Sequence, residues 1–259
     1  MLTPDQLPER LKALPWKRPV YLRGASLEDG PSVAIVGARA ASKLAMDRAH
    51  SWARHLAGRG VHVVSGGAFG VDGAAHRGAL AAGGTTTVVL GSGCDVWYPV
   101  RHAALFSEVL AQRGTLASLC PDGTHPTRTT FPARNPLIAA LADVVVIVEA
   151  DVRSGSLTTA AAAKKLGRVV VACPGSRGCE RLLAEGAAII EQAGDAELAL
   201  AGTPRYRVSV AGAGAIDPIA RQIQDAVAGG AEDIDEIVQR TGLTVRAVLR
   251  ALPMIERKQ

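Results

Sequence analysis

Short runs of hydrophobic residues alternate along this chain with longer segments in which apolar residues recur every three or four positions. The short runs are rich in valine and lie at 33–36, 61–64, 85–90, 115–119, 144–148 and 169–172. Such runs are typical of strands that are covered on both faces of a parallel sheet. The longer segments have the spacing of amphipathic helices, the clearest being 43–57, 71–82, 101–112 and 156–166. This alternation predicts an α/β fold.

The composition changes on both sides of the α/β region, which predicts the domain organisation. Prolines break any long helix in 1–32, which we interpret as a lead-in segment with one short edge strand at 19–22. The α/β domain follows over 33–200. Gly, Ala, Pro and Ser dominate 201–216, which predicts a linker. Residues 217–259 then predict a small helical domain.

This last domain has a helix–turn–helix rhythm. Its short amphipathic segments are 218–228, 233–240 and 244–252, with Gly242 in the turn between the last two. The third segment carries only two arginines. A helical packing or dimerisation module therefore explains the pattern as well as DNA binding does.

Composition narrows the class of protein further. The 259 residues are 48% hydrophobic but only 3% aromatic, and 29 Lys and Arg against 24 Asp and Glu give a net charge of +5. This charge is weak support for a polyanionic partner. The four cysteines form no C-x-x-C pair, so we expect reduced thiols, no metal site and a cytoplasmic location. No apolar run approaches the ~20 residues of a membrane-spanning helix, and no membrane partner is expected.

Three strands run into turns of glycine and small residues that open a helix. These turns lie at 37–39, 65–70 and 153–156. Backbone N–H groups at a helix N-terminus favour an anion, and parallel strands end at the same edge of a sheet. The sequence therefore predicts several phosphate contacts along one edge.

The first turn lies where a phosphate-binding loop would lie. Its second glycine is replaced by Ser42 and its magnesium-binding hydroxyl by Leu44, which argues against nucleotide hydrolysis. The chain also lacks the G-x-G-x-x-G of a dinucleotide site. We favour a phosphate contact at Gly37, with charge from Arg39 and Lys43. The alternative is that Gly37 only permits tight packing of strand and helix.

The second turn, 65–70, holds several glycines, which implies that some group approaches the backbone closely. Asp72 and His76 follow it one helical turn apart. We interpret these two as a structural hydrogen bond, because a catalytic dyad has no nucleophile at an obvious spacing.

The third turn joins an arginine to several hydroxyls, a combination suited to oxyanions, although an N-capped helix with an incidental arginine explains it too. A long loop is predicted at 121–134, with a helix beginning at Asn135. Phe131 in this loop is either a stacking platform for a base or an anchor that packs into the core.

Taken together, these segments resemble the DprA/Smf family of bacterial DNA-processing proteins. The matching segments are 33–39, 64–76, 84–91, 95–99, 131–135, 149–156 and 174–175. The resemblance implies an extended Rossmann-like parallel sheet with helices on both faces, and the tail from Asp217 is similar to the family's winged-helix domain. It also implies a homodimer that binds single-stranded DNA and hands it to the RecA recombinase in natural transformation, without catalysis or cofactors.

By the same resemblance, the DNA-binding residues come from all three turns and from the long loop. They are Gly37, Arg39, Lys43, Ser65, Gly66, Gly67, Phe69, Gly70, Phe131, Arg134, Asn135, Arg153, Ser154, Gly155 and Ser156. Phe69 stands where the family often has a basic residue, and we hypothesise that it replaces charge by stacking.

An enzyme or sensor for a small nucleotide is the alternative. Related Rossmann-like phosphoribohydrolases carry a Pro-Gly-Gly-x-Gly-Thr-x-x-Glu loop. Residues 174–180 are only a loose match to it, with Glu180 displaced.

Overall fold

The computed structural model describes residues 1–2, 7–12, 14, 18–27, 30–202, 222–223, 226, 229 and 234–243. The chain divides into two compact units, Met1–Arg207 and Val208–Gln259. In the second unit the helix α10, Ile234–Thr241, matches the expected helix at 233–240, and Ile237 on it is buried. The expected linker after residue 202 and the expected helices at 218–228 and 244–252 lie outside the described residues, apart from isolated positions.

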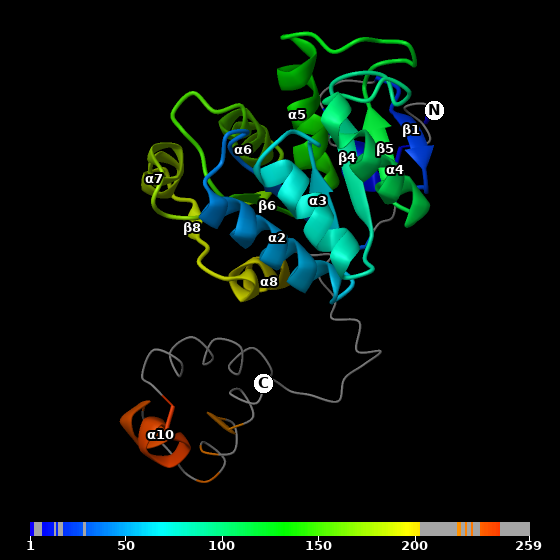
Figure 1. Cartoon of the computed structure of the whole chain (residues 1–259). Helices are drawn as coiled ribbons and strands as arrows, with labels where there is room; N and C mark the ends of the chain where they lie inside the picture. The colour runs from blue at the N-terminus through cyan, green and yellow to red at the C-terminus, as the bar shows by residue number, and fades with distance from the viewer. Residues whose placement is uncertain are drawn as a thin grey trace. The chain divides into compact units, whose positions relative to one another are not determined.

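The first unit is built on one eight-stranded sheet (Figure 1). Its strands are β1 Tyr21–Gly24, β2 Ser32–Val36, β3 His62–Ser65, β4 Thr86–Leu90, β5 Thr115–Ser118, β6 Val144–Ile147, β7 Val169–Ala172 and β8 Ala188–Ile189. They lie in the order β1-β5-β4-β3-β2-β6-β7-β8. Every neighbouring pair is parallel except β1 with β5. The extended Rossmann-like prediction is confirmed.

Helices cover both faces of this sheet, as expected. In chain order they are α1 Glu9–Lys12, α2 Lys43–Ala57, α3 Val71–Ala81, the 3-10 turn η2 Val100–His102, α4 Ala103–Ala111, α5 Thr130–Leu141, α6 Ser156–Lys165, α7 Arg177–Ala184 and α8 Ala193–Ala201. Side chains alternate between faces along β2. Val33 and Ile35 pack with α2, α3 and α8, whereas Ala34 and Val36 pack with α5, α6 and α7. Because both faces of the inner strands are covered, these strands are mostly apolar, and β6 and β7 are apolar throughout.

The described residues of the segment 1–32, which we interpreted as a lead-in, pack on the α/β unit. Strand β1 joins the sheet, and the buried Arg10 of α1 holds the start of β2. Its Nη1 donates to the hydroxyl of Ser32 (2.7 Å) and to the carbonyl of Leu141 (2.8 Å). A buried guanidinium needs such acceptors, so the segment is fastened to the domain by polar contacts as well as apolar ones.

The expected loop at 121–134 is shorter than predicted, because α5 begins at Thr130. Pro132 does not prevent this, since the first N–H groups of a helix have no intrahelical acceptor. Phe131 and Arg134 therefore lie on a helix, and their directions are set by its turns.

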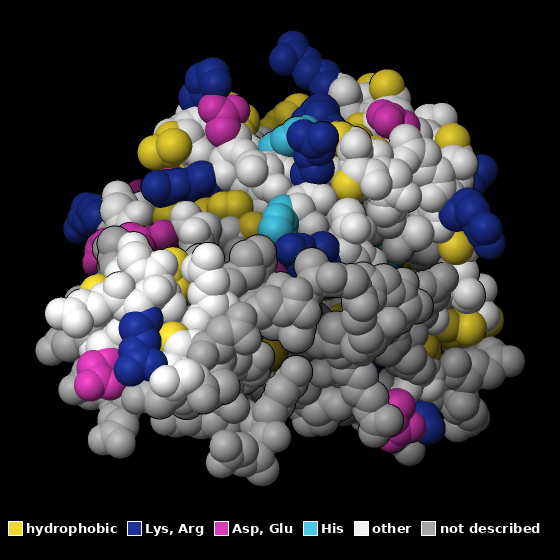
Figure 2. All heavy atoms as spheres, turned by 90° about the horizontal axis from the view of Figure 1, so that it is seen from below, with side chains coloured by type: hydrophobic (Ala, Val, Ile, Leu, Met, Phe, Trp, Pro, Cys, Tyr) yellow, Lys and Arg dark blue, Asp and Glu magenta, His cyan; other side chains and the backbone are white. Residues whose placement is uncertain are grey.

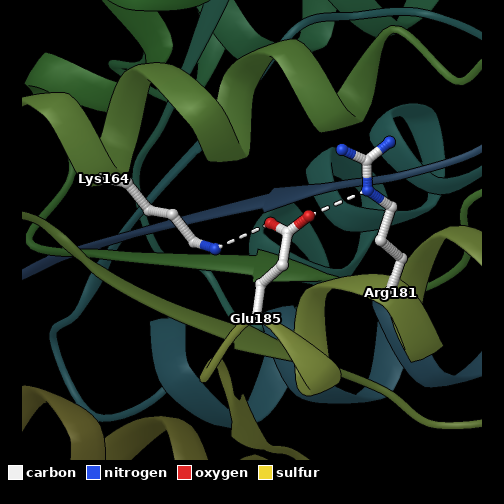
Figure 3. Close-up of polar contacts among 3 residues, drawn as sticks. All are labelled: Lys164, Arg181 and Glu185. Carbon is white, nitrogen blue, oxygen red and sulfur yellow. Dashed lines mark hydrogen bonds and ion pairs between the residues drawn. The ribbon is translucent and has the colours of Figure 1, made fainter.

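Ion pairs at the surface connect α6 to α7 (Figure 3). The carboxylate of Glu185 accepts hydrogen bonds from Lys164 Nζ on α6 (3.1 Å) and from Arg181 Nε on α7 (2.8 Å). These two hydrogen bonds, the one from Arg181 above all, lower the pKa of Glu185. Because the group is exposed, the network contributes little to stability.

All four cysteines are free thiols, as expected, and Cys94, Cys173 and Cys179 are buried. Among the described residues no three His, Cys, Asp or Glu side chains are grouped so that they could hold a metal ion. None of the helices in the described part of the chain has the length and apolarity needed to cross a bilayer.

Candidate nucleic-acid interface

The strand order reverses between β2 and β6, and the turns that follow these strands meet there. Ala38 N–H, after β2, donates to the Glu149 carbonyl after β6 (2.7 Å). Val71 N–H, at the start of α3, donates to the Ala38 carbonyl (3.3 Å). Ligands of open α/β sheets bind at such a reversal, beyond the carboxyl ends of the strands. The structure thus brings the first two glycine turns together with the end of β6.

The N-terminus of α2 at this reversal is occupied by a side chain of the protein itself. The Glu149 carboxylate accepts from Ser42 N–H at 3.0 Å and from the Ser42 hydroxyl. The position where we expected a phosphate therefore holds a carboxylate. Lys43 is exposed and pairs with Asp47 on its own helix (2.6 Å). Of the charged residues of the first turn, Arg39 is the one that lines the neighbouring hollow.

This hollow has a volume of about 40 Å³, which is room for only a few water molecules. It lies beyond the carboxyl ends of β2, β3 and β4 and against α5. Its lining is Arg39, Gly66, Ala68, Phe69, Tyr98, Pro99, Phe131 and Arg134. A nucleotide base is too large to enter such a space.

Three aromatic rings line this hollow and form what we call the aromatic platform: Phe69, Tyr98 and Phe131. Phe69 is 41% exposed and Tyr98 is 44% exposed. The rings of Tyr98 and Phe131 are tilted against each other, with centroids 5.6 Å apart. The Arg39 guanidinium lies 4.9 Å from the Phe131 centroid, within cation–π range. Large apolar rings left open to water beside an arginine indicate a surface for flat, anionic ligands.

Tyr98 is a functional candidate that the sequence analysis did not include among the site residues. A Tyr-Pro pair close to a glycine turn was a visible signal in the sequence, but no local pattern indicated that the tyrosine contacts Phe131. That contact arises because the loop after β4 folds over the start of α5, where Gly91 leaves room for the Phe131 ring.

In the second turn, the groups that approach the glycines belong to the protein. Gly70 has φ +73°, and a Cβ there would collide with the carbonyls of Ala38 and Arg39. A Cβ on Gly66 would collide with the Arg134 guanidinium. The Ser65 side chain is fully buried and donates to the Ile35 carbonyl (2.6 Å). Of these three residues only Gly66 lines the hollow, and the ring of Phe69 is partly exposed to solvent.

Arg134 lies in the wall of the hollow but is 6% exposed, and its Nη1 bonds the backbone, whereas its buried Nε has no hydrogen-bond partner. Its Nη1 donates to the carbonyl of Gly66 (2.7 Å) and to that of Val89, so it joins the ends of β3 and β4. Burial lowers the pKa of Arg134 to about 10, and the charge of Asp72 opposes this shift. Burial likewise raises the pKa of Asp72, and Arg134 opposes that shift. The two opposite charges therefore stabilise each other without a direct ion pair, and we call them the buried couple.

Asn135 is also buried, and its side chain connects α5 to the third turn. Its Nδ2 donates to the Gly155 carbonyl (3.1 Å) and to the Thr158 hydroxyl. In that turn the hydroxyls of Ser154 and Ser156 bond each other (2.7 Å), and Arg153 is exposed. The third turn is therefore fastened to the helix that carries Phe131, but the hollow is lined by other residues.

The expected bond between Asp72 and His76 is replaced by other partners. The Thr86 hydroxyl donates to the Val63 carbonyl (2.7 Å) and therefore accepts the hydrogen bond from His76 Nδ1–H (2.8 Å). Asp72 accepts from Ala68 N–H at 3.3 Å. Burial lowers the pKa of His76 to about 3, so the ring is neutral near pH 7. His76 is a structural residue, as the sequence analysis favoured, but with a different partner.

On the face drawn in Figure 2, the described Lys and Arg side chains stand apart, with acidic and apolar groups among them, so this face shows no continuous basic patch among the described residues.

An eight-stranded Rossmann-like sheet, with glycine turns and an arginine–aromatic surface beyond its carboxyl ends, defines an α/β protein of the nucleotide- or polynucleotide-binding class. Comparison with known proteins narrows this class. The family model for DNA recombination-mediator protein A matches residues 1–200, and the chain belongs to this DprA/Smf family.

Curated relatives agree with this assignment. A Mycobacterium tuberculosis protein named for DNA processing, DprA, is 43% identical over 240 residues, which cover 87% of this chain and 60% of that protein. DNA processing protein DprA of Streptococcus pneumoniae is 40% identical over 171 residues, covering 64% of this chain and 60% of that protein. The chain thus spans about 60% of the length of these relatives.

Solved structures also match. DNA processing protein A from Streptococcus pneumoniae superposes with a TM-score of 0.69 at 34% identity, over 74% of this chain and 70% of that one. The protein from Helicobacter pylori, whose structure is described as giving insight into its single-stranded DNA binding mode, also has a TM-score of 0.69. It is 32% identical, over 75% of this chain and 93% of that one.

Proposed function

We propose that this protein is a recombination mediator that binds single-stranded DNA, protects it and loads it onto the RecA recombinase during natural transformation. The observation that carries the proposal is the exposed aromatic platform with Arg39 over Phe131, at the carboxyl edge of the sheet. The single-stranded DNA binding described for the Helicobacter pylori relative supports the same ligand.

The geometry favours an unpaired strand for a physical reason. Bases in a duplex stack on one another, so their faces are not available to a protein ring. An unpaired base can lie on Phe131, Tyr98 or Phe69, and each such stack contributes about 1–3 kcal/mol. Arg39 then offers its guanidinium to the adjoining phosphate while it remains close to the Phe131 ring.

We divide the predicted DNA-binding residues into three groups according to their position relative to the strand. Arg39, Phe69 and Phe131 contact the strand directly. Ser65, Gly66, Gly67, Gly70, Arg134 and Asn135 shape and hold the surface beneath it. Gly37, Lys43 and the third turn, Arg153, Ser154, Gly155 and Ser156, border its path.

The proposal extends to partners and place. The protein acts as a homodimer in the cytoplasm, where incoming strands meet the recombinase, and it works by binding without catalysis of its own. The loose match at 174–180 to a phosphoribohydrolase loop does not favour the alternative enzyme, because the Glu180 carboxylate accepts from Gly175 N–H in its own turn (2.7 Å).

A titration of labelled oligonucleotides across a range of salt concentrations tests the proposal. We expect single strands to bind more tightly than duplex. Arg39→Ala is expected to weaken binding and to reduce the slope of log affinity against log salt by about 0.7, the value for one phosphate contact on a single strand. Arg59→Ala is the matched control, because Arg59 pairs with Glu197 at the other end of α2.

Normal binding of single strands by Arg39→Ala at every salt concentration would overturn the proposed site. Release of free base from nucleoside monophosphates by the wild-type protein would favour the nucleotide enzyme instead.

A further inference from the structure

Phe69 is supported from behind by a histidine that the proposed site does not include. The ring of His102, from the 3-10 turn before α4, meets the Phe69 ring edge-on, with centroids 4.9 Å apart and planes at 71°. His102 is 5% exposed, whereas Phe69 is 41% exposed. A ring that is partly open to solvent therefore packs against one that is buried.

The same histidine also holds the backbone of the second glycine turn. Its Nδ1 lies 3.0 Å from the carbonyl oxygen of Gly67. A carbonyl only accepts, so Nδ1 carries the proton of this bond. His102 thus holds two groups at once. One is the backbone of the turn at Gly67, two residues before Phe69, and the other is the Phe69 ring.

His102 is itself held by the core. Its ring meets Phe106 of α4 at 6.0 Å with planes at 81°, and Phe106 is fully buried. Gly73 on α3 packs against the other side of the ring, where a Cβ would lie 2.6 Å from His102 Cε1. A chain of ring contacts therefore runs from the core through His102 to the solvent-facing Phe69.

The surroundings of this ring disfavour its charged form. Burial lowers the pKa of His102, and the Arg77 guanidinium on α3 lowers it further, against the opposing effects of the Gly67 carbonyl and Asp72. A neutral ring packs against an aromatic ring without the cost of burying a charge.

We propose that His102 is a positioning residue for nucleic-acid binding, which holds the Phe69 ring and the Gly67 carbonyl in the arrangement that receives a base. It acts through Phe69 and does not touch the ligand. The inference rests on the proposed function and assigns to that site a residue that lies outside it.

Two substitutions separate the two contacts. His102→Asn keeps an N–H donor for the Gly67 carbonyl and removes the ring. His102→Phe keeps a ring edge and removes the donor. Since base stacking accounts for a factor of roughly 5 to 100 in affinity, we expect each variant to bind a single-stranded oligonucleotide about fivefold more weakly.

A double-mutant cycle with Phe69→Ala distinguishes positioning from general stability. If His102 acts through Phe69, His102→Asn weakens binding in the wild-type background and changes it less than about twofold in Phe69→Ala. His55→Asn, which alters a histidine paired with Glu197 away from the platform, is the matched control and should bind normally. Thermal unfolding of each variant shows whether it is folded. If one of the two His102 variants is not folded, the other is used for the test.

Three results overturn the inference. In the first, both His102 variants bind as wild type although Phe69→Ala binds weakly, which leaves the proposed function intact. In the second, His102→Asn weakens binding equally with and without Phe69, which shows a structural role only. In the third, the wild-type protein does not bind single strands at all, which removes the proposed function as well.

Discussion

The Glu149 carboxylate is hydrogen-bonded to the backbone N–H of Ser42, at 3.0 Å, and so lies across the N-terminus of α2. This contact joins the end of β6 to the helix that follows β2, at the point where the strand order reverses. The protein thus satisfies with its own anion the helix end that a phosphate would otherwise occupy.

Glu149 should therefore contribute to stability. We expect Glu149→Gln to lower the free energy of unfolding by about 0.3–1 kcal/mol, because it removes the charge at the helix end but keeps an acceptor. Glu149→Ala should cost about 1–2 kcal/mol, since Ser42 also loses its partner. Urea unfolding measures both, with Glu108→Gln on the exposed side of α4 as the control. Equal stability of Glu149→Ala and wild type would contradict this role.

The buried couple of Arg134 and Asp72 should be among the most sensitive positions of the domain. Arg134→Met removes the donor for the Gly66 and Val89 carbonyls and leaves Asp72 buried without its opposite charge. We expect a loss of about 3–5 kcal/mol in urea unfolding. Adding Asp72→Asn should recover part of that loss, because the second change removes the uncompensated charge. A loss below about 1 kcal/mol in Arg134→Met would show that the couple does not stabilise the site.

The aromatic platform should contribute to affinity without changing its salt dependence. We expect Phe69→Ala and Tyr98→Ala each to weaken single-strand binding by about 1–3 kcal/mol, with an unchanged slope against log salt, because stacking releases no counterions. Fluorescence anisotropy at several salt concentrations measures both quantities. Leu198→Ala, at a residue of similar exposure on α8, should bind normally. A flatter slope in Phe69→Ala would mean that the ring organises a phosphate contact instead.

The buried His76 and the half-buried His62 predict how stability depends on pH. Burial lowers the pKa of His76 to about 3 and that of His62 to about 4, from an ordinary value of 6.5. Between these values and pH 6.5 the unfolded chain binds protons that the folded chain does not, so stability falls as the pH falls. Each histidine contributes a slope of up to about 1.4 kcal/mol per pH unit over that window.

Urea unfolding between pH 7 and pH 4 measures this slope. His62→Asn should reduce it, whereas His55→Asn, at a partly exposed surface residue, should leave it unchanged. An identical slope in His62→Asn and wild type would show that folding does not lower the pKa of this histidine.

The strands could be predicted because a strand that is buried on both faces consists mainly of apolar residues, and such a run is visible in the sequence. Each of β2, β6 and β7 is apolar on both faces, so the valine runs at 33–36, 144–148 and 169–172 identify them without tertiary information. The predicted start of α5, at Asn135, was wrong because the Pro, Thr and Gly residues before it suggest a loop. A proline in the first turn of a helix carries no penalty, and composition alone does not reveal this.

By itself, the sequence determined the α/β alternation, the glycine turns and the family, since these depend on neighbouring residues and on their spacing. Only the tertiary structure decided which side chains face the ligand surface. Arg134 turns inward to two carbonyls, Glu149 closes a helix end from 107 positions away along the chain, and Tyr98 joins Phe131. The reason is physical. A polar group bonds to the partner that the packed strands bring within hydrogen-bond distance. Strand order decides which groups come that close, and adjacent residues do not encode strand order.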